Sequence, residues 1–126
     1  MKRNKILISI WSDPSMYINL MFLINYLLDK NYEIILVCKK IDNIKDFNFF
    51  VKKNSNLFVR QTNLDGRLGY LKFFFLKFSY LIKKTPKVII SINFISLFFT
   101  FFLPSKKIKL IYYNFDFDLK KKYNNL

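Results

Sequence analysis

Histidine is absent from this chain of 126 residues, and cysteine occurs once, at Cys38. Ser-His-Asp triads, histidine bases and histidine metal sites are therefore excluded, and one thiolate cannot build a zinc site. A single cysteine also cannot close an internal disulfide, and the lysine-rich start has no long apolar core followed by a small-residue cleavage site. We therefore expect a cytoplasmic protein.

Glycine is nearly as scarce, since Gly66 and Gly69 are the only two. The glycine-rich turns that bind dinucleotides or the phosphates of a P-loop nucleotide are therefore missing. We expect this chain to bind no metal and no cofactor by itself.

Long uninterrupted hydrophobic runs are also missing. The longest apolar run, residues 88–103, spans 16 residues and is broken by Ser91, Asn93 and Ser96, whereas a membrane-spanning helix needs about 20 residues. A buried strand followed by a helix explains the run better. Its insertion into a membrane, in a small non-enzymatic membrane-associated basic protein, is the alternative.

Acidic residues are few, 8 against 22 lysines and arginines, and the net charge is +14. Such a balance favours anionic partners: phosphates, nucleic acid or a membrane surface. The abundance of Lys, Asn, Ile and Phe also resembles an AT-rich coding bias, which would supply lysines that no partner selected. We expect no specific nucleic acid partner, and nonspecific nucleic-acid binding is a third possibility.

Hydrophobic residues are plentiful, at 52% of the chain, and 126 residues suit a single domain. We expect residues 1–118 to form that domain and residues 119–126 to be a basic polar tail.

Five short hydrophobic runs alternate with four helical patterns. The runs are residues 5–11, 32–38, 57–60, 88–92 and 108–113, and the helical patterns are residues 14–30, 43–53, 67–84 and 93–103. Nearly continuous runs, above all 88–92 and 108–113, indicate strands buried on both faces of a parallel sheet. Short links and right-handed crossovers order the strands 3-2-1-4-5. The predicted fold class is α/β, a Rossmann-like doubly wound parallel sheet of about five strands with helices on both faces.

Polar residues follow several of the predicted strands, where sheets of this class bind their ligands. The candidate contacts are Ser12, Asp13, Asn93, Asn114 and Asp116. Asp13 has a second interpretation that we favour: it precedes Pro14 and suits the cap of a helix that begins there. No catalytic residue is assigned.

The helix over residues 67–84 has two apolar faces. We expect one face to pack on the sheet: Leu68, Leu71, Phe74, Phe75, Phe78, Leu81 and Ile82. The other combines aromatic and aliphatic side chains with lysines: Lys72, Phe73, Leu76, Lys77, Tyr80, Lys83 and Lys84. This second face suits an anionic membrane surface, and contact with a missing part of the protein or with a partner is an equal alternative.

Several segments together resemble the amino-terminal domain of GT-B glycosyltransferases of the retaining, family-4-like kind. The segments are KILISIWSDPS, LLDKNYEIILVCK, PKVIISINFISLFFTFFL and KIKLIYYNFDFD. They are similar to the family's first strand and helix, its "G-H-x-V" turn and second strand, its "D-V-I-x-x" strand and its "x-x-I-Y-x-x-H-E" strand end. The chain departs from the family at the glycine-rich first loop, replaced by Ser12-Asp13-Pro14, at the turn glycine, replaced by Asn31, and at the strand-end His-Glu, replaced by Phe115-Asp116.

The resemblance implies that this half binds a glycan or lipid-linked acceptor and is inactive alone. A second Rossmann-like domain or subunit would bind the nucleotide sugar and supply a pair of glutamates, and Glu33 is the only glutamate here. Many relatives act at the inner face of a membrane, so the resemblance also implies peripheral attachment there.

Overall fold

The computed structural model describes residues 4–52, 54–63, 66–92 and 108–113, and its centre is a five-stranded, all-parallel sheet. The strands are β1 (Lys5–Ile10), β2 (Glu33–Lys39), β3 (Leu57–Thr62), β4 (Val88–Ile92) and β5 (Lys109–Tyr113). The helices are the 3-10 turn η1 (Pro14–Met16), α1 (Ile18–Asp29), α2 (Ile44–Phe50) and α3 (Gly66–Lys84). The strand order is β3-β2-β1-β4-β5, so the predicted Rossmann-like α/β fold and its order are confirmed.

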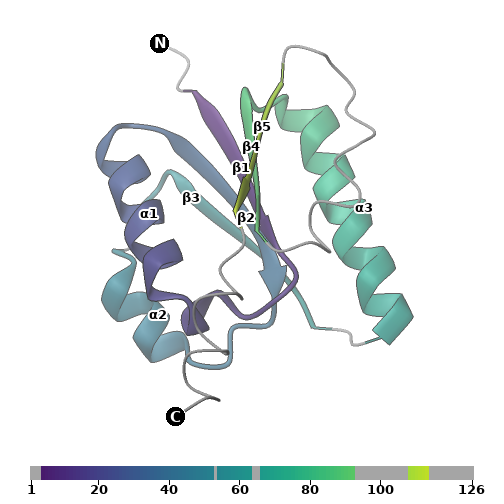
Figure 1. Ribbon diagram of the computed structural model, residues 1–126, viewed down its shortest axis with the longest axis horizontal. Helices are drawn as coiled ribbons and strands as arrows, with labels where there is room; N and C mark the ends of the chain where they lie inside the picture. The colour runs from purple at the N-terminus through teal and green to yellow at the C-terminus, as the bar shows by residue number, and fades with distance from the viewer. Residues whose placement is uncertain (1–3, 53, 64–65, 93–107, 114–126) are drawn as a thin grey trace.

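Helices cover both faces of the sheet, with α1 and α2 on one side and α3 on the other (Figure 1). Side chains along β1 alternate between the two layers, because successive residues of a strand point to opposite faces. Ile6 and Ile8 pack with the α1 and α2 layer, whereas Leu7 packs with the α3 layer. The core therefore has two halves separated by the sheet.

The link from α1 to β2 consists of residues 30–32, whereas Asn31 alone separates the predicted helix from the predicted strand. Asn31 lies between them with a φ of 67°, in the left-handed region that asparagine tolerates better than most residues. The amide of Tyr32 then donates to the carbonyl of Leu27, which closes the helix end. This turn lets β2 run parallel to β1 with Lys5 opposite Glu33.

The outer strand β5 corrects one expectation. Burial on both faces was predicted for residues 108–113, but Leu110, Ile111 and Tyr112 are 36–40% exposed. The prediction holds for β4, where Ile89 to Ile92 are buried between β1 and β5. Because β5 is an edge strand, its apolar run is not enclosed as that of a central strand is.

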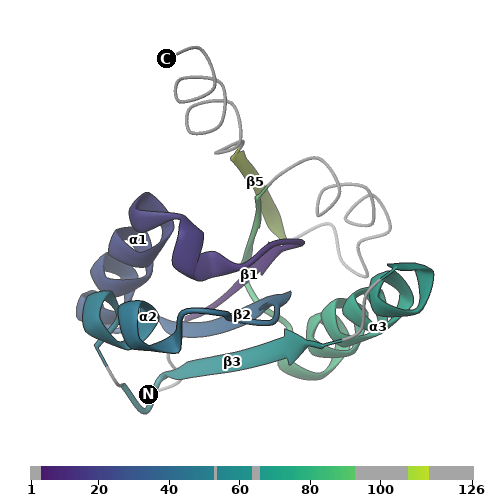
Figure 2. The same cartoon turned by 90° about the horizontal axis from the view of Figure 1, so that it is seen from below.

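The orientation of α3 corrects a second expectation. The predicted core face is largely outside: Leu68, Leu71, Phe75 and Ile82 are 53–72% exposed, and only Leu81 of that set is fully buried. The stripe that packs on the sheet consists of Gly69, Phe73, Lys77 and Leu81. Figure 2 shows α3 on its own side of the sheet, across from α1 and α2.

The predicted membrane face of α3 is therefore wrong in its central members. Phe73 and Lys77 are 1% exposed. Leu76 and Tyr80 are partly buried against the same core, and the Tyr80 hydroxyl accepts a hydrogen bond from Arg60 of β3. Lys72 and Lys83 do lie on the surface, and Lys84 is partly exposed with its ammonium over the Phe58 ring. Apolar residues occur all around this helix, so periodicity alone did not determine its orientation.

Other boundaries differ slightly from prediction. The helix predicted over residues 14–30 is divided at Tyr17 into η1 and α1, and β3 continues through Gln61 and Thr62, beyond the predicted strand 57–60. The predicted helix over residues 93–103 and the tail 119–126 lie outside the described residues.

No helix in the described part of the chain is long and apolar enough to cross a membrane. Residues 88–92, the first part of the alternative membrane segment, form the buried strand β4.

Candidate functional site

The segment after β1 is held in place by Asp13. Its Oδ1 accepts hydrogen bonds from the amide and hydroxyl of Ser15 at 2.9 and 2.7 Å, and its Oδ2 accepts one from the amide of Asp42 at 3.0 Å. Pro14 follows at the first position of η1, as the capping interpretation predicted. The carboxylate therefore ties the loop after β1 to the loop after β2.

A polar hollow of about 510 Å³ lies at the carboxyl edge of β1, β2 and β3. Its described lining comes from the ends of these strands and from the segments that follow them: Trp11, Ser12, Asp13, Met16, Lys39, Lys40, Asp42, Thr62 and Asn63. The hydroxyl of Thr62 is buried and has no hydrogen-bond partner in the described part of the chain. A buried hydroxyl without a partner is typical of a site where a water molecule or a ligand supplies the missing hydrogen bond.

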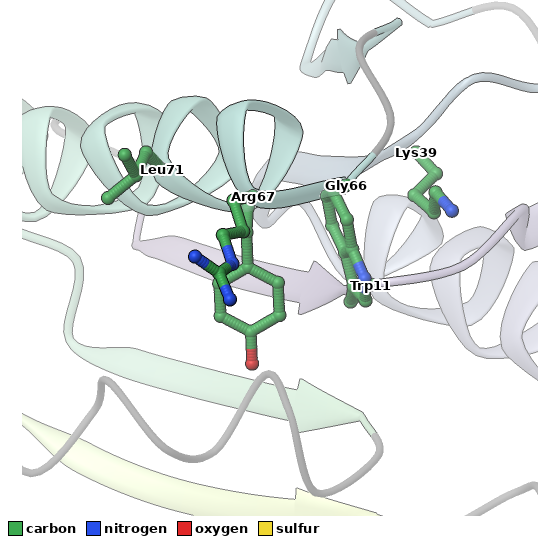
Figure 3. A pocket seen from close by; sticks show the side chains of 6 residues that line it. Trp11, Lys39, Gly66, Arg67 and Leu71 are labelled. Atoms are coloured by element: carbon green, nitrogen blue, oxygen red, sulfur yellow. The ribbon is translucent and has the colours of Figure 1, made fainter.

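A second, aromatic hollow of about 580 Å³ opens on the α3 side of the same edge (Figure 3). Its described lining is Trp11, Lys39, Gly66, Arg67, Tyr70 and Leu71. Figure 3 shows Trp11 just beyond the end of β1, with Lys39 on one side and Arg67, at the start of α3, on the other.

Trp11 is the centre of this aromatic hollow. Its ring meets Tyr70 edge to face with centroids 5.3 Å apart, and Phe73 with centroids 5.2 Å apart. The ammonium of Lys39 lies 4.8 Å from the centroid of the Trp11 ring, within cation–π range. Since Trp11 and Lys39 line both hollows, the two spaces adjoin.

The electrostatic character of the two hollows differs. The charged side chains in the described lining of the aromatic hollow are Lys39 and Arg67, both cationic, whereas the polar hollow also contains Asp13 and Asp42. Burial raises the pKa of the Tyr70 phenol above its usual range, so the group is a neutral hydroxyl at physiological pH. The aromatic hollow therefore suits an anion next to an apolar ring.

A buried polar group lies beneath this edge. Lys77 donates a hydrogen bond to Ser91 Oγ, which in turn is 3.4 Å from Ser9 Oγ. Burial lowers the pKa of the Lys77 amine from 10.5 to about 7. All three residues are nearly inaccessible, with at most 1% of their surface exposed.

The structure brings together two of the five predicted contacts. Ser12 and Asp13 line the polar hollow, and the Ser12 hydroxyl lies 3.4 Å from that of Tyr17. Asn93, Asn114 and Asp116 lie outside the described residues. Both carboxylate oxygens of Asp13 accept hydrogen bonds within the chain, so its first role is structural.

The sequence interpretation missed the aromatic hollow. Trp11 ends the first predicted strand and Lys39 directly follows the second, so both lie at the carboxyl edge of the sheet, where ligands of parallel sheets bind. Arg67 and Tyr70 open the helix that follows the third strand, and only the fold places them beside Trp11. In three dimensions they lie beside Trp11, which is more than fifty positions earlier in the chain.

Comparison of the sequence with models of known protein families found no match, and comparison with curated proteins found none either.

Proposed function

We propose that this chain is the acceptor-binding half of a glycosyltransferase that transfers a sugar from a nucleotide sugar to a glycan or lipid-linked acceptor. The observation that carries the proposal is the pair of adjoining hollows at the carboxyl edge of the sheet, where Trp11 and Lys39 are shared. Ligands of open α/β sheets bind at this edge, and concave sites with aromatic and polar linings suit organic ligands.

The proposal includes a division of labour. The only glutamate, Glu33, begins β2 and therefore lies at the opposite end of the strand from the hollows. A pair of acidic donor-site residues of the glutamate type would have to come from another domain or subunit. The chain is then inactive alone, and transfer requires a donor-binding partner.

Titrating the purified chain with candidate acceptors, with its amide signals monitored by NMR, tests the proposal. Acceptor glycans should perturb residues around Trp11 and Lys39, and no sugar should be transferred when a nucleotide sugar is added. Turnover of a nucleotide sugar by the 126-residue chain alone would contradict the division of labour.

A second candidate function is that of a small, non-enzymatic, membrane-associated basic protein. One observation favours it: the outer face of α3 exposes Leu68, Leu71, Phe75 and Ile82, and a shallow apolar groove of about 310 Å³ lies among Leu71, Phe74, Phe75 and Phe78. Exposed Arg67, Lys72 and Lys83 lie on the same helix, and the whole chain carries a charge of +14. We infer that the occupant of this face is an anionic lipid surface, because apolar insertion and charge attraction then act together.

This membrane surface is also compatible with the acceptor-binding role, since a lipid-linked acceptor would be presented at the same interface. It replaces the face predicted from the sequence, which contained Phe73 and Lys77. Peripheral attachment is thus proposed through the outer face of α3, with Lys72 and Lys83 as its lysine contacts.

A further inference from the structure

We propose that the aromatic hollow binds a phosphorylated saccharide, with the sugar ring against Trp11 and Tyr70 and the phosphate between Lys39 and Arg67. This inference rests on the proposed function, because it identifies that ligand as the acceptor. It goes further because it names the chemical class of the acceptor and assigns four residues to its recognition.

Aromatic rings form a platform in this hollow. Trp11 and Tyr70 meet edge to face with centroids 5.3 Å apart, and Phe73 supports Trp11 from the buried side at 5.2 Å. Such a cluster holds the indole in a fixed position and lowers the entropy lost when a ligand packs on it. An apolar platform next to a polar hollow matches a sugar, which has apolar ring faces and a hydroxyl-bearing rim.

Two cationic side chains lie beside this platform. Lys39 places its ammonium at the rim of the hollow, 4.8 Å from the centroid of Trp11, and Arg67 extends from the first turn of α3. A guanidinium forms paired hydrogen bonds with phosphate oxygens, and an ammonium adds a compact charge. The amino end of a 19-residue helix contributes further positive potential at the same position.

The distribution of charge around the two hollows sets the orientation of the bound ligand. Among the described residues, the acidic side chains that line these two spaces are Asp13 and Asp42, and both belong to the polar hollow, where Asp42 is exposed. There the two carboxylates offset the charges of Lys39 and Lys40, so a phosphate gains little attraction, whereas sugar hydroxyls can donate to a carboxylate and an amide oxygen. One ligand can therefore span both spaces, with its phosphate on the α3 side and its hydroxyls toward Asp42.

Three probes separate the parts of this proposal: glucose 1-phosphate, glucose and inorganic phosphate, each titrated into the full chain by calorimetry and NMR. Glucose 1-phosphate should bind about tenfold more tightly than either other probe, because only it offers both a ring and a charge. Equal affinity for glucose would overturn the role of the cations, and equal affinity for inorganic phosphate would overturn the role of the aromatic platform. Absence of saturable binding of glucose 1-phosphate at millimolar concentrations would overturn the whole inference.

Two variants of exposed cationic residues on α3 form a matched pair. Arg67→Gln should weaken binding of glucose 1-phosphate by about tenfold and leave binding of glucose unchanged, since one charge-assisted contact is lost. Lys72→Gln removes the same charge from an exposed position outside the described lining and should change neither affinity. Equal losses in both variants would show that bulk charge attracts the ligand, which contradicts the site.

Tyr70→Leu tests the aromatic platform without removing Trp11, which also packs against Phe73. It should weaken binding of glucose 1-phosphate while leaving that of inorganic phosphate unchanged. The outcomes also separate this inference from the proposed function. A chain that binds neutral glycans at this edge but does not prefer the phosphorylated sugar would refute the inference alone. One that binds glucose 1-phosphate but supports no transfer with any donor-binding partner would refute the proposed function alone.

Discussion

Lys77 on α3 and Ser91 on β4 are joined by a buried hydrogen bond, with 3.3 Å between Nζ and Oγ. The bond lies between the helix and the sheet, and Ser9 of β1 extends it at 3.4 Å from Ser91. A lysine with only 1% of its surface exposed is unusual. Its charged form loses the hydration that it has in water, and a hydrogen bond to the Ser91 hydroxyl replaces that hydration only in part. Folding therefore opposes protonation of Lys77.

The first prediction concerns the pH dependence of stability. The Lys77 pKa is about 7 in the folded chain against 10.5 as the ordinary value, so the unfolded chain binds more protons between these values. Its contribution to the free energy of unfolding should rise with pH across that window, by up to about 1.4 kcal/mol per pH unit. Lys77→Met should remove this contribution and stabilise the chain at pH 7 by at least about 1 kcal/mol.

Chemical denaturation from pH 7 to about 9 measures this slope, with exposed Lys72→Met as the matched control that should keep it. The same slope in wild type and Lys77→Met would contradict the prediction.

The second prediction concerns Asp13. Asp13→Ala removes the acceptor for the amides of Ser15 and Asp42 and should lower the free energy of unfolding by about 2 kcal/mol. Asp29→Ala, at the exposed carboxyl end of α1, should change it by less than about 0.5 kcal/mol. Thermal and urea unfolding compare the two variants, and equal stabilities would show that the link between the two loops is unimportant.

The third prediction tests the outer face of α3 as a membrane surface. Phe75 is 72% exposed on α3, and Phe49 is 79% exposed on α2, in the opposite layer. Phe75→Ser should weaken binding to vesicles of anionic phospholipid by about tenfold, while Phe49→Ser should leave it unchanged. Neither variant should destabilise the fold, because both rings are outside the core.

Vesicle sedimentation measures this binding, which should also fall at high salt. Equal loss in the two phenylalanine variants, or undiminished binding by Phe75→Ser, would remove α3 as the contact surface.

The fourth prediction uses Cys38 as a probe. Cys38 is fully buried in β2, and its pKa is raised to about 12, first by burial and then by the negative charge of Asp13. The thiolate is the reactive form, so the native chain should resist iodoacetamide and the unfolded chain should react. The labelling rate should therefore follow the unfolded fraction as urea is added. Rapid, complete labelling of the native chain would contradict the burial of β2.

Much of the fold could be predicted from the sequence because its signals are local. The strands β1, β2 and β4 are continuous apolar runs, and the helical segments between consecutive strands favour a parallel sheet with right-handed crossovers. Asp13 followed by Pro14 likewise indicates a helix start, because the capping contact of Asp13 reaches only to Ser15. These features need no knowledge of what lies across the molecule.

The candidate site could be predicted only in part. The carboxyl edge followed from the strand order, and Ser12 and Asp13 do line a hollow there. The aromatic hollow did not follow, because Trp11 and Tyr70 become neighbours only when α3 crosses the sheet. A contact between distant segments depends on where a helix lies and on its rotation about its own axis.

The sequence by itself thus determined the strands, their parallel order and the cap at Asp13, since each depends on short-range patterning and chain connectivity. Only the tertiary structure decided which side of α3 faces the sheet. Apolar residues occur on every side of that helix, and its packing buries Phe73 and Lys77 while leaving Phe75 in solvent. The physical reason is that a nearly uniform helix has no strong preferred face of its own, so contacts with β1, β2 and β3 set its rotation.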